Sequence, residues 1–172
     1  MLKNEIIEKA KEICAENHIS EYPVNIVGLC ERFGISVYQE YLPDDVSGFI
    51  VAQEKPFDKY DSNQVIVVNL SDCASRRRFT IAHELAHYIL HKKPDDALYA
   101  HRDAGQNGGM EQEANIFASN LLMPEDLVRS ALKQQGEAGR KLFDFEKIEF
   151  ISGQFAVSRP AAQVRLEQLR LI

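Results

Sequence analysis

The stretch that organises this 172-residue chain reads FTIAHELAHYILH and covers residues 79–91. Within it lies the pattern His83-Glu84-x-x-His87, in which the two histidines are four positions apart. On an α-helix, residues four apart lie one turn from each other on the same face, so both imidazoles can reach a single ion. The stretch therefore predicts a helix that carries a metal site.

Glu84 directly follows the first histidine, which places its carboxylate beside the predicted metal. A carboxylate in that place can take a proton from a metal-bound water, which is the chemistry of hydrolysis. Apolar residues recur at helical spacing through the stretch, as expected for a half-buried helix. We predict that His83 and His87 bind Zn²⁺ and that Glu84 is the catalytic base, although Mn²⁺ or another divalent metal can occupy such ligands. The alternative is a structural helix without metal.

His91 continues the histidine series, but about 12 Å of helix rise separates it from His83. Ligand atoms about 2.1 Å from one zinc ion lie much closer together than that. The residues after it, Lys92, Lys93 and Pro94, are typical of a helix end. We therefore expect His91 to close the helix and not to bind the metal.

A second predicted helix offers Glu111 as the third ligand. At 100° per residue, Glu111 shares a face with the small residues Ala114 and Ala118. Glu113 lies away from that face. Asn115 is one turn beyond Glu111, where its side chain can hydrogen-bond a ligand histidine. The alternative for Glu111 is a solvent-exposed carboxylate at a helix start, favoured by the helix dipole.

Residues 46–52 and 65–69 have the pattern of β-strands and are joined by a polar stretch, so we expect an antiparallel pair. If the first strand lies at the sheet edge above the metal, its free backbone groups can hold an extended peptide. The residues of this predicted edge are Gly48, Phe49, Ile50 and Val51. Gly48 can equally mark a bulge.

Composition excludes several classes of protein. Hydrophobic residues make up 45% of the chain, which suits one folded domain without cross-links. The three cysteines form no Cys-x-x-Cys pair, so we expect no disulfide framework and a cytoplasmic location. We expect neither a membrane span nor a signal segment. The net charge of −6 argues against nonspecific nucleic-acid binding by the whole molecule.

The last part of the chain has a helix-turn-helix-like pattern. Residues 145–151 and 159–171 have helical spacing, and Ser158 is the expected cap of the second helix. Such a pair can bind DNA, but we favour two packed helices because the second helix carries few cations. These cations are Arg159, Arg165 and Arg170.

The sequence around both predicted ligand helices resembles the ImmA/IrrE family of bacterial and phage metallopeptidases. The match covers residues 78–91, then residues 111–124, and resumes weakly over residues 155–161. Ala86 stands where many relatives have glycine. The first two segments are specific in combination, and the resemblance extends from about residue 20 to near the end of the chain.

The resemblance implies a zinc metallopeptidase in which the residues matching His83, His87 and Glu111 bind the metal. It also implies that the residue matching Glu84 is the catalytic base. The corresponding fold is an α+β, zincin-like domain, with a small antiparallel sheet packed on helices. We place this domain in residues 1–127, followed by a C-terminal helix-turn-helix-like region in residues 128–172 that packs on the same domain.

The resemblance further implies that the substrate is a helix-turn-helix transcriptional repressor. We see no complete amino-terminal DNA-binding domain in this sequence, so we expect such a repressor to be cleaved in trans. Two alternatives stay open. The chain could be a metal-stabilised regulatory protein that binds a repressor or DNA without cleavage, or a DNA-binding regulator that acts through residues 145–172.

Overall fold

The computed structural model describes residues 1–91, 98–99, 108–136 and 142–172. The predicted polar connection over residues 92–109 lies mostly outside these ranges. In chain order the described elements are α1 (Lys3–Glu16), α2 (Ile26–Arg32), β1 (Ser36–Glu40), β2 (Gly48–Phe57), β3 (Ser62–Asn69), α3 (Ala74–His91), β4 (Leu98–Tyr99), α4 (Gly108–Leu122), α5 (Glu125–Gly136), α6 (Asp144–Phe155) and α7 (Arg159–Gln168). None of the described helices combines the length and the apolar composition needed to cross a membrane.

The α+β class is confirmed, but the sheet is mixed. Its strand order is β1-β3-β2-β4. The predicted antiparallel pairing of β2 with β3 is confirmed, whereas β1 runs parallel to β3. The reason lies in β3, whose residues Val65–Val68 are all fully buried. A continuous apolar run of this kind suits a central strand. One edge of β3 pairs with β2, and the opposite edge pairs with β1.

The position of β2 differs from the prediction of a free sheet edge. Val51 pairs with Tyr99, and Ala52 pairs with Leu98, so β4 lies beside this end of β2. The predicted edge is therefore wrong at Val51. A short strand from the segment after α3 pairs here, and hydrophobic patterning within β2 cannot reveal it.

Gly48 permits a close approach between β2 and α3. A Cβ atom at this position would lie 2.6 Å from Cγ2 of Thr80 and 2.7 Å from the carbonyl oxygen of Val67. Gly48 pairs with Val68 in regular register, and the irregularity of β2 lies between Ala52 and Phe57. The glycine is therefore required by packing and does not mark a bulge.

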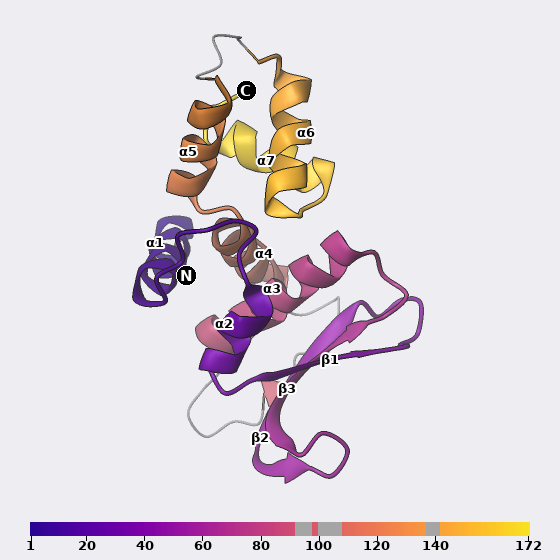
Figure 1. The fold of residues 1–172 in the computed structure, drawn as a ribbon. Helices are drawn as coiled ribbons and strands as arrows, with labels where there is room; N and C mark the ends of the chain where they lie inside the picture. Colours follow the sequence, from indigo (N-terminus) through magenta and orange to yellow (C-terminus); the bar gives the residue numbers. More distant parts are fainter. Residues whose placement is uncertain (92–97, 100–107, 137–141) are drawn as a thin grey trace.

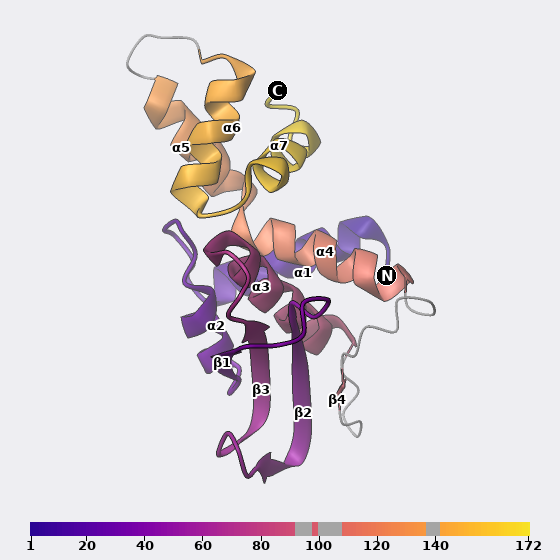
Figure 2. The ribbon, with the colours of Figure 1, turned by 90° about the vertical axis from the view of Figure 1, so that its right-hand side faces the viewer.

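The helices form a layer against the sheet. α3 packs on β2 and β3 and also contacts α4, which in turn packs against α1. In both views α1, α3 and α4 lie between the sheet and the group formed by α5, α6 and α7 (Figures 1 and 2). α3 is thus held by the sheet and by a second helix, which fixes the orientation of its side chains.

The C-terminal helices share the core of the rest of the chain. Buried residues of α5, α6 and α7 belong to the same hydrophobic cluster as those of α1 and α3. Phe155 stacks on Tyr22, with 4.6 Å between the ring centroids. α6 extends through Phe155, beyond the predicted helix end at residue 151, and its C-cap residue Ala156 has a φ of 52°. Ser158 caps α7 as predicted, accepting a hydrogen bond from the backbone amide of Ala161.

Candidate metal centre

α3 positions the three residues of the His83-Glu84-x-x-His87 pattern on its buried side. His83 is 7% exposed, Glu84 is 2% exposed and His87 is 4% exposed. Their apolar neighbours on the helix, Leu85 and Ala86, are fully buried. Polar groups at such depth are costly unless they are paired, so these three side chains need partners within the protein.

α4 brings Glu111 to the two histidines. The Nε2 atom of His83 lies 3.1 Å from Oε2 of Glu111, and the Nε2 atom of His87 lies 3.2 Å from Oε1 of the same carboxylate. The two Nε2 atoms are 3.1 Å apart. One ligand atom from each of the three residues thus lies within 4.8 Å of the others.

The donor set of this triad fits a zinc ion. Ligand atoms about 2.1 Å from a tetrahedral zinc are about 3.4 Å from each other, close to the spacing of His83, His87 and Glu111. Two imidazole nitrogens and one carboxylate oxygen are also a ligand set of catalytic zinc sites that keep a fourth position for solvent. The triad is therefore a possible metal-binding site.

Glu111 gives the triad an open side. It lies in the first turn of α4, and its side chain is 39% exposed, whereas the side chains of His83 and His87 are 9% and 5% exposed. The histidines are enclosed by the protein, and solvent reaches the cluster past the carboxylate. A ligand or substrate can approach from that direction.

The ring nitrogens that point away from Glu111 are also engaged. Nδ1 of His83 lies 3.0 Å from Oδ1 of Asn115, and Nδ1 of His87 lies 3.0 Å from Nδ1 of His91. His91 in turn places its Nε2 atom 3.0 Å from Oε2 of Glu113. His91 and Glu113 were not among the predicted site residues. The spacing of four between His87 and His91 was the available signal, whereas Glu113 is brought close by the contact between α3 and α4.

Burial makes His87 a neutral imidazole. Loss of hydration, together with the neighbouring charges of His83 and His91, lowers the pKa of His87 to about 3. A metal binds only an unprotonated ring nitrogen, so His87 is in a ligand-competent protonation state at neutral pH.

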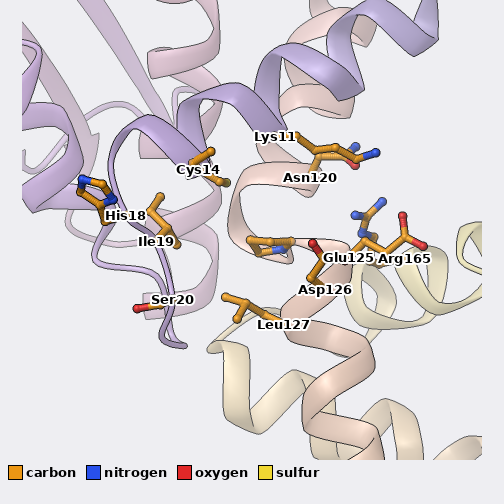
Figure 3. A pocket seen from close by; sticks show the side chains of 12 residues that line it. Lys11, Cys14, His18, Ile19, Ser20, Asn120, Glu125, Asp126, Leu127 and Arg165 are labelled. Atoms are coloured by element: carbon orange, nitrogen blue, oxygen red, sulfur yellow. The ribbon is translucent and has the colours of Figure 1, made fainter.

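A separate cavity of about 490 Å³ lies between α1, α5 and α7 (Figure 3). Its lining includes Cys14, Asn120 and the buried Arg165, and it contains no residue of the triad. The cavity is therefore distinct from the metal centre.

Comparison with known proteins agrees with this geometry. The sequence profile of the IrrE N-terminal-like domain, a peptidase family, matches residues 30–167, which is well over half of the chain. The chain belongs to the IrrE N-terminal-like family. The matched range includes α3 and α4, so all three residues of the triad lie within the IrrE-type domain.

Among the curated relatives of this IrrE-type chain are proteins named as metallopeptidases. The Radiation response metalloprotease IrrE of Deinococcus radiodurans is 34% identical over 99 residues, which are 55% of this chain and 30% of that protein. Metallopeptidase ImmA of Bacillus subtilis is 26% identical over 108 residues, which are 63% of this chain and 59% of that protein. The matches therefore span less than two thirds of the length of either relative.

A solved structure supports the fold of the IrrE-type domain. A Mycobacterium tuberculosis transcriptional regulator superposes with a TM-score of 0.63 at 19% sequence identity. The superposition covers 95% of this chain and 46% of that one. At this identity the likeness concerns the fold alone.

Proposed function

We propose that this chain is a metal-dependent endopeptidase, with Zn²⁺ as its metal, that cleaves a helix-turn-helix repressor in trans. The observation that carries the proposal is the meeting of His83, His87 and Glu111. Glu84, which directly follows His83 in the sequence, is buried on the same helix. The metallopeptidase relatives support the reaction class. Mn²⁺ is the alternative metal, because the same ligands accept it.

In the proposed reaction each residue of the site has a distinct task. His83, His87 and Glu111 would hold a divalent cation, and when bound this cation would polarise a peptide carbonyl and make water more acidic. Glu84 takes the proton of the attacking water and afterwards gives it to the leaving amine. Because Glu84 is enclosed by protein, bulk water competes poorly for its carboxylate, which favours this proton transfer.

We further propose that β2 holds an extended segment of the substrate through Gly48, Phe49 and Ile50. In the described parts of the chain β4 is paired with Val51 and Ala52, and its register does not reach these three residues. Backbone groups along a strand edge can accept an additional strand. A peptide bound there would pair with β2 on the same edge as β4.

The function is tested by the substitution Glu84→Gln. The variant is expected to bind Zn²⁺ like the wild type and to lose cleavage by about 10²–10⁴-fold, because the amide cannot take the proton. Purified protein with bound Zn²⁺ is incubated with a helix-turn-helix repressor encoded beside it, and the fragments are measured by mass spectrometry. Glu12→Gln, at a half-exposed position of α1, is the matched control. Equal cleavage by Glu84→Gln and wild type would refute the role of Glu84.

A metal-stabilised protein that binds a repressor without cutting it is the second candidate. The same incubation distinguishes the peptidase from this candidate. Stoichiometric binding of a repressor that stays intact with or without a chelator would favour the binding protein. The DNA-binding alternative has less support. Arg165 is 4% exposed and donates from Nε to the carbonyl of Met123, and Arg159 pairs with Glu149, so two of the cations of the last helix are already engaged.

A further inference from the structure

We propose that His91 and Glu113 are positioning residues that hold the ring of His87 in the orientation and tautomer needed for metal binding. The inference rests on the proposed function, since it concerns the same site. Three groups follow one another in space: the ring of His87, the ring of His91 and the carboxylate of Glu113. They come from two helices, α3 and α4.

The carboxylate at one end of this series sets the direction of its hydrogen bonds. An ionised carboxylate only accepts, so Nε2 of His91 carries a proton and donates it to Oε2 of Glu113 across 3.0 Å. A neutral His91 then has an unprotonated Nδ1 that accepts. The partner across 3.0 Å is Nδ1 of His87, which must therefore be the donor.

Because Nδ1 of His87 carries the proton in this series of hydrogen bonds, Nε2 of the same ring is unprotonated. With its proton on Nδ1, neutral His87 presents a lone pair on Nε2. That atom lies 3.1 Å from Nε2 of His83 and 3.2 Å from Oε1 of Glu111, at the proposed metal position. Glu113 thus selects the metal-binding tautomer of His87 through His91, without contacting the metal.

The surroundings make this series effective. The side chain of His91 is 7% exposed and that of Glu113 is 19% exposed, so water competes weakly for their hydrogen bonds. Glu113 stands two residues after Glu111 on α4. A single helix therefore supplies one ligand and anchors another. Partners of this kind change metal affinity by about 10–100-fold when removed.

The first measurement is the affinity of the full chain for Zn²⁺, by competition with a chelating dye. His91→Phe keeps a ring but neither accepts nor donates, and Glu113→Ala removes the anchor, so each is expected to weaken Zn²⁺ binding by about tenfold or more. His91→Gln retains an acceptor and a donor and should bind more tightly than His91→Phe. Glu12→Ala, at an exposed side chain of α1, is the matched control and should bind like the wild type.

The second measurement is the tautomer of His87 in the metal-free protein, by ¹⁵N NMR at about pH 8, where imidazoles are neutral. The wild type is expected to carry the proton on Nδ1, and His91→Phe to shift it toward Nε2. Circular dichroism establishes that each variant is folded. Zn²⁺ affinity within about twofold of wild type for both His91→Phe and Glu113→Ala, with an unchanged tautomer, would overturn the inference.

The two measurements also separate this inference from the proposed function. If the wild type cleaves nothing but His91→Phe weakens Zn²⁺ binding, the positioning role of His91 and Glu113 stands and the proposed peptidase activity fails. A wild-type protein that binds no Zn²⁺ would end the proposed function, and the tautomer of metal-free His87 would still decide for or against the pair.

Discussion

At the scale of single residues, the two ligand histidines differ in what supports them. An amide oxygen of Asn115 faces Nδ1 of His83, whereas another imidazole, that of His91, faces Nδ1 of His87. His87 therefore lies among ionisable neighbours in a buried place, with His83 on one side and His91 on the other. Adding a proton to His87 is accordingly unfavourable, as its low pKa records.

This arrangement predicts that the metal-free protein loses stability in mild acid. His87 titrates near 6.5 in an unfolded chain but at about 3 in the folded one, so the unfolded state binds more protons between these values. The free energy of unfolding should therefore decrease as the pH falls from about 6.5 toward 3. Urea denaturation at about pH 7.5 and about pH 5 measures this decrease.

His87→Gln is the comparison for that measurement, because glutamine is uncharged at both pH values. Its free energy of unfolding is expected to fall less between the two pH values than that of the wild type. Identical pH dependence in the two proteins would show that His87 does not contribute to the loss of stability in acid.

At the scale of secondary-structure elements, the contact between α3 and α4 builds the metal centre. Ala82 and Ala86 on α3 and Ala114 and Ala118 on α4 are all fully buried. Small side chains allow two helices to approach closely, and this brings Glu111 within hydrogen-bonding distance of the histidines. The separation of the helices and the geometry of the site are therefore linked.

Enlarging a residue of this contact should weaken both stability and metal binding. Ala114→Leu forces additional atoms into a filled core and is expected to cost about 1–3 kcal/mol of stability. It should also lower Zn²⁺ affinity, because α4 must shift and carry Glu111 with it. Thermal denaturation and chelator competition measure the two effects. Gln112→Leu, at an exposed position of α4, is the control and should change neither appreciably.

At the scale of the whole molecule, the C-terminal helices are part of the structure that supports the site. The predicted boundary between residues 127 and 128 falls inside α5. Buried residues on both sides of it belong to one hydrophobic cluster, and Phe155 reaches back to stack on Tyr22. We expect the two predicted parts to unfold together in one cooperative transition.

Phe155→Ala tests this expectation. Removing the fully buried ring is expected to lower the free energy of unfolding by about 3–5 kcal/mol, with a single transition observed by probes in both parts of the chain. Phe145→Ala is the matched control on the same helix. Phe145 is 65% exposed, and its loss should change stability by no more than about 0.5 kcal/mol. Two separate transitions in Phe155→Ala would instead support two independent domains.

Much of the candidate site could be predicted from local sequence. The helical period around His83 and His87 follows from residues a few positions apart, and the rise of a helix explains why His91 cannot join them on one ion. The face that Glu111 shares with Ala114 could be predicted in the same way. The structure brings His83, His87 and Glu111 together, and their binding of a metal stays a prediction. The geometry could be predicted because it is nearly invariant within one helix.

The remaining features depend on contacts between distant parts of the chain. The partner of His91 is Glu113, 22 residues later, and the sequence-based helical angle placed Glu113 away from the ligand face. In the sheet, β3 lies between β1 and β2, and β4 covers Val51. The hydrophobic periodicity within one helix or strand does not determine which segments of the chain become its neighbours. That choice is made by burying one common core, so only the tertiary structure decided it.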